Sequence, residues 1–263
     1  MNVFRPNSLV SALFAAATGL ALAGGIATAS AQESQRLTLD HYMDMESVSS
    51  PQISPDGKTI VYTRGWTDKV NDSRESSLWI MDAEGGRNRH LLDAGSAQWS
   101  PDGTRILYTA PGDPGGAQLH VRWMDAEGAV SQITRLENGP DSPQWSPDGN
   151  WIAFTSRVDD AADFAGVQLP ERPDGAKWTP DPKIVERAGY KRDRAGYVDT
   201  GWTQVFVVPA EGGTARQLTY GYWNHSDISW NPDGSELYFT SYRRKDWNRP
   251  ENWGESEIYS VSV

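Results

Sequence analysis

The chain contains no cysteine. This absence excludes disulfide bonds, thiolate metal sites and a cysteine nucleophile. The fold must therefore be held by its hydrophobic core and by hydrogen bonding between its strands, which is easier for a large domain than for a small one. At 263 residues the chain can form one large all-β domain or two ordinary domains.

Basic residues are scarce. Lys and Arg number 24 against 35 Asp and Glu, so the net charge is −11 at pH 7. Proteins that bind nucleic acids concentrate Lys and Arg on one face, and we therefore expect no nucleic-acid partner. An acidic surface of this kind is typical of a well-solvated protein.

Motifs that carry chemistry are also missing. The sequence has no Gly-x-Ser-x-Gly nucleophile elbow, no His-Glu-x-x-His and no calcium loop of the Asp-x-Asp-x-Asp-Gly type. The glycine pairs at 85–86 and 212–213 follow strands and close hairpins, so they are not phosphate loops. We assign no catalytic residue, no metal ligand and no cofactor to this chain. The four histidines lie in separate repeats, where we expect them to be strand or loop residues: His41, His90, His120 and His225.

Long apolar stretches are confined to the N-terminus. Arg5 supplies a positive start, residues 9–26 are apolar and small, and Ala29-Ser30-Ala31 offers a cleavage site before Gln32. Residues 1–31 are thus predicted to be a signal peptide, and the protein to be exported to the periplasm or the extracellular space. No membrane span is expected after cleavage. The alternative is an uncleaved N-terminal anchor.

What the sequence does have is a turn that recurs four times. Each copy follows a short apolar strand end with Pro-Asp-Gly and then a run of β-forming residues. Pro presets φ for a type I turn, Asp tolerates the second corner and Gly can take positive φ. The aspartates have this backbone reason to be there, so we do not interpret them as calcium ligands. The four copies lie at residues 52–57, 98–103, 144–149 and 229–234.

The spacing of these turns predicts the fold class. Their prolines are separated by 46, 46 and 85 residues. Four antiparallel strands in roughly 40–50 residues is the period of a β-propeller blade. We therefore predict an all-β chain in which residues 32–263 form the N-terminal part of a β-propeller, an incomplete ring of about four blades. The expected blades lie near residues 48–94, 95–138, 140–221 and 223–263.

Two segments depart from the repeat. Residues 158–201 form an insertion that lengthens the third blade, and residues 243–255 combine charge with tryptophan. Long irregular segments inside a compact unit are commonly functional or part of an interface. The alternative for both segments is a solvated loop.

The residues resemble a known family. The repeated Trp-Ser-Pro-Asp-Gly followed by an Ile-Ala-Phe-Thr-Ser type strand looks like the propeller repeat shared by TolB and by prolyl oligopeptidase family serine peptidases. The closer resemblance, to the acylaminoacyl-peptidase and dipeptidyl-peptidase branch, rests on the third repeat. The lead-in at 37–40 with 50–57 resembles the family's usual entry into its first blade. The strings that carry the third-repeat resemblance are 190–197, 204–213 and 216–219.

The resemblance implies a propeller followed by an α/β-hydrolase domain that carries Ser, Asp and His. That domain is absent from this sequence, so no catalytic residue can be transferred to it, and we interpret the chain as a fragment or truncated product. Dipeptidyl peptidases of the family grip the substrate's α-amine with propeller carboxylates. Glu251 and Glu255 are weak candidates for that role, and solvated charge is the alternative.

Three functions remain open from the sequence. The first is the non-catalytic propeller of an exported serine peptidase, which gates access of peptide substrates to the missing hydrolase domain. The second is a TolB-like periplasmic propeller that binds protein partners. The third is a secreted structural propeller with no enzyme attached.

Overall fold

The computed structural model describes residues 37–125, 127–159, 170–179, 185, 190–193, 196–198, 201–243 and 256–263. The chain divides into two units, Met1–Thr38 and Leu39–Val263. Only residues 37 and 38 of the first unit are described, and the predicted signal peptide at 1–31 lies outside the described residues. Within the described part, no helix is long and apolar enough to cross a membrane.

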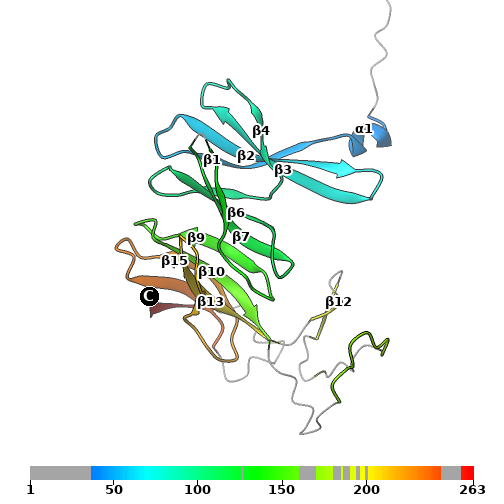
Figure 1. Cartoon of the computed structure of the whole chain (residues 1–263), viewed down its shortest axis with the longest axis vertical. Coiled ribbons are helices and arrows are strands. Elements are labelled where there is room, and N and C mark those ends of the chain that lie inside the picture. Colours follow the sequence, from blue (N-terminus) through cyan, green and yellow to red (C-terminus); the bar gives the residue numbers. More distant parts are fainter. Residues whose placement is uncertain are drawn as a thin grey trace, which may run out of the picture. The chain divides into compact units, whose positions relative to one another are not determined.

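The second unit begins with a short helix and a four-stranded antiparallel sheet, here called blade 1 (Figure 1). Helix α1 (Leu39–Met43) occupies the lead-in whose structure the sequence left open. The strands pair in chain order, and they are β1 (Ser47–Ile53), β2 (Thr59–Asp68), β3 (Ser73–Asp82) and β4 (Arg89–Leu92).

Blade 2 repeats the same antiparallel order. Its first hairpin encloses the second copy of the Pro-Asp-Gly turn, as the sequence predicts. The strands are β5 (Ala97–Trp99), β6 (Arg105–Pro111), β7 (Ala117–Trp123) and β8 (Val130–Gln132).

Blade 3 carries the insertion between its second and third strands. Its strands are β9 (Pro140–Trp145), β10 (Trp151–Val158), β13 (Trp202–Pro209) and β14 (Arg216–Gln217). The described part of the insertion includes a small hairpin of β11 (Lys191–Arg192) and β12 (Gly196–Tyr197). The ring centroids of Tyr190 and Tyr197 lie 6.1 Å apart at this hairpin.

Blade 4 has three described strands, β15 (His225–Trp230), β16 (Glu236–Ser241) and β17 (Glu257–Ser262). The repeated antiparallel sheets, in each of which the same turn joins the first two strands, confirm the predicted all-β fold of propeller blades.

Hydrophobic cores lie between successive blades because the middle strands bury both of their faces. On β6, Ile106 packs into the core shared with blade 1, whereas Leu107 packs into the core shared with blade 3. Ile152 and Ala153 of β10 divide in the same way between the cores shared with blades 2 and 4. This alternation follows from the two-residue period of a strand, and it explains why these strands read as continuous apolar runs.

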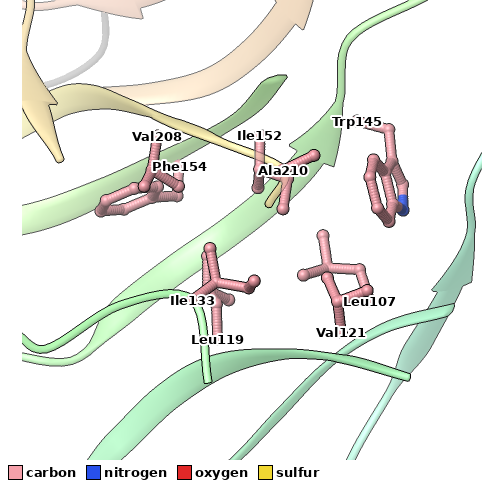
Figure 2. Close-up of a cluster of buried hydrophobic side chains, with 9 residues drawn as sticks. All are labelled: Leu107, Leu119, Val121, Ile133, Trp145, Ile152, Phe154, Val208 and Ala210. Carbon is pink, nitrogen blue, oxygen red and sulfur yellow. The ribbon is translucent and has the colours of Figure 1, made fainter. Parts of the chain in front are cut away.

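The core between blades 2 and 3 is the largest of the three. Figure 2 shows its side chains in two facing groups. Blade 2 contributes Leu107, Leu119, Val121 and Ile133, and blade 3 contributes Trp145, Ile152, Phe154, Val208 and Ala210.

Candidate functional site

The Pro-Asp-Gly turn of blade 2 shows why its residues recur. The buried Ser100 hydroxyl donates to Oδ1 of Asp102 and accepts the backbone N–H of Arg105 at 2.9 Å. Oδ1 of Asp102 also accepts the N–H of Thr104 at 3.1 Å. Gly103, with φ of 72°, donates its N–H to the Ser100 carbonyl at 2.9 Å. The side chains of Ser and Asp thus satisfy the backbone groups that the turn leaves unpaired.

The other turns repeat this network. Ser54 with Asp56 and Ser146 with Asp148 make the same hydroxyl–carboxylate bond. In blade 4 an asparagine replaces the serine. Asn231 Nδ2 donates to Asp233 Oδ1 at 2.6 Å, and Asn231 Oδ1 accepts the N–H that follows the turn, that of residue 236, at 3.0 Å.

These bonds also set the charge of the turn carboxylates. The hydrogen bond from the turn serine is the main cause that holds the pKa of Asp56, Asp102 and Asp148 below its usual value. For Asp233 the side chain of Ser235 is the main cause, and again the pKa is lowered. Each turn therefore presents an ionised carboxylate at neutral pH.

The turns are tied together from blade to blade. The indole N–H of each turn tryptophan donates to the backbone carbonyl of the glutamine in the preceding turn. These bonds run from Trp99 to Gln52 (3.1 Å), from Trp145 to Gln98 (3.3 Å) and from Trp230 to Gln144 (3.3 Å). In blade 1 the tryptophan position is held by Ile53, which is exposed.

A buried glutamine–threonine pair recurs in blades 2 and 3. Gln118 Oε1 accepts from the Thr134 hydroxyl, which accepts the N–H of Leu119, each at 2.9 Å. Gln204 and Thr219 form the same pair at 2.9 Å. Sequence reasoning missed this pair. The signal that could have found it is a Gln before an apolar residue in the third strand and a Thr after an apolar residue about 15 residues later, a combination that occurs in both blades.

The residues singled out from the sequence do not come together into a described site. Glu251 and Glu255 lie outside the described residues, as does most of the segment 243–255 and much of the insertion 158–201. No group of His, Cys, Asp or Glu in the part of the chain that the structure describes could hold a metal ion.

The histidines lie in separate elements, as expected. His90 Nε2 lies 2.8 Å from the Asp93 carboxylate, on the surface. His120 stacks on Tyr108 with ring centroids 5.5 Å apart, and burial lowers its pKa. His225 is 1% exposed, with its ring edge-on to Phe239 at 4.7 Å. His90, His120 and His225 therefore lie in three different blades, each in its own surface or core environment, and His41 lies in helix α1.

A cleft of about 420 Å³ lies between blades 1 and 2, on the side of the Pro-Asp-Gly turns. Thr59, Asp56 and Asp82 line it from blade 1, while Trp99 and Asp125 line it from blade 2. This volume falls within the range of small-ligand sites. We take this cleft as the candidate site.

The cleft carries charges of both signs. Four aspartates line it, and the Asp82 carboxylate pairs with Arg87 at 2.8 Å. Arg89 and Arg122 also line it, and the buried Nε of Arg122 has no hydrogen-bond partner among the described residues. The arrangement suits a polar, charged ligand rather than an apolar one.

Comparisons with known proteins place the chain beside peptidases. No protein-family profile matches it. Over 210 residues it is 28% identical to the uncharacterized peptidase YuxL of Bacillus subtilis, a match that covers 78% of this chain and 31% of the relative. The expected resemblance to prolyl oligopeptidase family peptidases is confirmed. Dipeptidyl-peptidase 5 of Porphyromonas gingivalis is 29% identical over 89 residues, which are 32% of this chain and 13% of the relative.

The fold is shared with a solved peptidase. The acylaminoacyl peptidase of Pyrococcus horikoshii superimposes with a TM-score of 0.62 at 15% identity, over 84% of this chain and 31% of the peptidase. The chain therefore spans less than a third of the length of the peptidases that it matches. What it shares with them is the propeller-like portion.

Proposed function

We propose that this chain is the non-catalytic propeller portion of an exported serine peptidase of the prolyl oligopeptidase type. In the longer protein the hydrolase domain cuts peptides, and the propeller gates their access to it. Its substrates are peptides.

The observation that carries this proposal is the match to a Bacillus subtilis peptidase across 78% of the chain but only 31% of the relative. The chain itself has no Gly-x-Ser-x-Gly. A triad needs a nucleophile and a base within hydrogen-bond reach, with the base oriented by a carboxylate. The triad of the proposed enzyme therefore has to come from outside this chain.

The scaffold supports the proposed gating role. Successive blades are joined by buried cores and by bonds between their turns, and close-packed cores resist deformation. We propose that such a scaffold excludes folded proteins and lets small peptides reach the hydrolase domain. The export part of the proposal rests on the predicted signal peptide at residues 1–31.

Two experiments test the proposal. The gene beyond codon 263 is sequenced and inspected for a Gly-x-Ser-x-Gly motif followed by Asp and His, which we expect to find. The purified 263-residue chain and the full-length product are then assayed on acylaminoacyl and dipeptidyl nitroanilides. We expect turnover only by the full-length product, with short peptides cut and folded proteins left intact.

The outcomes separate the alternatives. A coding sequence without the nucleophile motif would rule out the peptidase and favour a TolB-like module that binds proteins. Hydrolysis by the 263-residue chain alone would show that its own residues carry chemistry. Cleavage of folded proteins by the full-length product would contradict the gating role.

A further inference from the structure

Arg105 fills the space between blades 2 and 3 on the side of the Pro-Asp-Gly turns. Its guanidinium binds the Glu211 carboxylate at 2.7 Å and donates to the Gly149 carbonyl at 3.1 Å. It also lies over the ring of Trp145 at 5.0 Å and that of Trp123 at 6.0 Å. These contacts combine an ion pair, a carbonyl acceptor and aromatic faces, which together recognise a guanidinium.

The repeat places Thr59 of blade 1 at the position of Arg105. Each donates its backbone N–H to the hydroxyl oxygen of the turn serine five residues earlier, at 3.0 Å for Thr59 and 2.9 Å for Arg105. In the hairpin that follows, Thr59 pairs with Asp82 as Arg105 pairs with Trp123. Blade 1 therefore has a short side chain where blade 2 has an arginine.

The register of the next turn aligns Asp125 with Glu211. Met124 donates its N–H to the carbonyl of residue 104, and Ala210 donates to that of residue 150. Beyond this point the turns close differently: in blade 2 Gly128 donates its N–H to Oδ1 of Asp125 at 2.8 Å, whereas in blade 3 a backbone carbonyl is the acceptor. Asp125 and Glu211 each come one residue after Met124 and Ala210. The acidic partner of Arg105 thus has a counterpart in blade 2 that faces blade 1.

All the counterparts of the Arg105 contacts line the cleft between blades 1 and 2. Trp99 corresponds to Trp145 and Gly103 to Gly149, since they occupy the same places in the preceding turn. Asp82 of blade 1 holds the place that Trp123 holds in blade 2. The four counterparts that line the cleft are therefore Trp99, Gly103, Asp125 and Asp82.

The junction between blades 3 and 4 supports this comparison. There the equivalent residue is Trp151, which packs with Trp230 against the core. A large side chain therefore occupies this position at two junctions, while Thr59 leaves a cleft at the third.

We propose that the cleft between blades 1 and 2 binds the arginine side chain of a peptide. Asp125 pairs with the guanidinium, the Gly103 carbonyl accepts one of its N–H groups and Trp99 provides a cation–π face. The ionised turn carboxylates of Asp56 and Asp102 add negative potential.

The basic residues of the cleft are available to bind the backbone of the peptide. Arg87 is already paired with Asp82. Arg89 and Arg122 line the wall, and their N–H groups are donors for carbonyl oxygens of the peptide backbone.

The test is calorimetric titration of the 263-residue chain with acetyl-Gly-Arg-Gly-amide and with the same peptide carrying citrulline, which keeps the shape and removes the charge. We expect at least tenfold weaker binding of the citrulline peptide. Asp125→Asn is expected to weaken arginine binding about tenfold, a factor typical of one charged contact. In Thr59→Arg the new arginine side chain should fill the cleft itself, so we expect this variant to lose peptide binding and to have a higher Tm.

Glu84→Gln is the matched control, because Glu84 holds the place of Asp125 in blade 1, is exposed and does not line the cleft. It should leave the affinity unchanged. Equal affinity for the two peptides, or undiminished binding by Asp125→Asn, overturns the proposal. If Thr59→Arg does not fold, these two comparisons still decide the question. Absence of binding to the arginine peptide at millimolar concentration also overturns it.

Discussion

The hydrogen-bonding capacity of single residues explains the repeated turn. Ser and Asn serve equally at its first position, because both offer a donor to the turn aspartate and an acceptor for the N–H five residues later. Identity of the side chain matters less than this pair of groups. Pattern recognition from the sequence found the turn, and the structure explains its asparagine variant.

Asn231→Ala should lower the free energy of unfolding by about 1–2 kcal/mol, because the turn loses the three hydrogen bonds of this side chain and leaves a backbone N–H unpaired. Asn231→Ser should lose less than half as much, since serine makes the same pair of bonds in the other three turns. Urea denaturation measures both. Equal losses in the two variants would contradict the role assigned to the side-chain bonds.

His225 has a pKa that burial shifts strongly in the folded chain. In the folded chain the pKa of His225 is lowered from 6.5 to about 4. Burial is the main cause, and the positive charge of Arg243 is the second. Neither ring nitrogen has a hydrogen-bond partner among the described residues. The folded state thus favours the neutral ring, so its contribution to stability is present above pH 6.5 and is lost as the pH falls towards 4.

We expect His225→Phe to remove part of this acid sensitivity. Between pH 7.5 and pH 4.5 the wild-type chain should lose roughly 2 kcal/mol more than the variant, as the difference in pKa requires. Phe keeps an aromatic ring beside Phe239. Urea titrations at both pH values measure the loss, and His90→Gln, at an exposed histidine, is the control. Identical pH dependence of the wild-type chain and His225→Phe would refute the prediction.

At the scale of elements, the turns act as contacts between blades. A Cβ added at Gly103 would lie 3.3 Å from Cδ of Pro55 in the preceding turn, and one added at Gly149 would lie 3.5 Å from Cδ of Pro101. At Gly57, in blade 1, nothing lies within 4 Å of such a Cβ. The glycines share nearly the same φ, so they differ mainly in the neighbouring proline.

Gly103→Ala should therefore destabilise the chain more than Gly57→Ala. Both variants are strained by about 1 kcal/mol because their φ is positive. The contact with Pro55 should add about 0.5–1 kcal/mol to the first alone. Thermal unfolding of the two variants measures the difference. An equal loss of stability in the two variants would contradict a steric contact between the added methyl group at residue 103 and Pro55.

The elements also show where sequence reasoning succeeded. The runs of β-forming residues that follow the four Pro-Asp-Gly turns form β2, β6, β10 and β16, because alternation, β-branched residues and the flanking turn all favour the same state. Helix α1 was left open, since five residues carry too little periodicity to predict a helix. Strand β14 ends at Gln217, and Thr219 bonds β13 through its side chain, which donates to Gln204 Oε1 and accepts the N–H of Val205.

For the whole molecule, charge and stability change together in acid. The net charge is −11 at pH 7 and the isoelectric point is about 4.8. Near that pH mutual repulsion vanishes, while the protonation of His225 also weakens the fold. Exposed apolar side chains such as Val48 and Ile53 on β1 are then free to associate.

Light scattering from pH 4 to pH 8 should show association rising steeply below about pH 5.5 and reaching a maximum near the isoelectric point, where protein solubility is lowest. His225→Phe should shift the onset to lower pH, because it removes the contribution from unfolding but leaves the charge nearly unchanged. Scattering that is independent of pH would contradict the prediction.

The blades, the turn that joins the first two strands of each and the resemblance to peptidases can be predicted from the amino-acid sequence, because they depend on local backbone preferences and on a pattern repeated along the chain. Which side chains meet between blades depends instead on tertiary packing. The cleft depends on Thr59, Trp99 and Asp125, which lie on two different sheets. Its space arises from a difference in side-chain volume at one register position, and register between sheets is set by packing rather than by any local sequence signal.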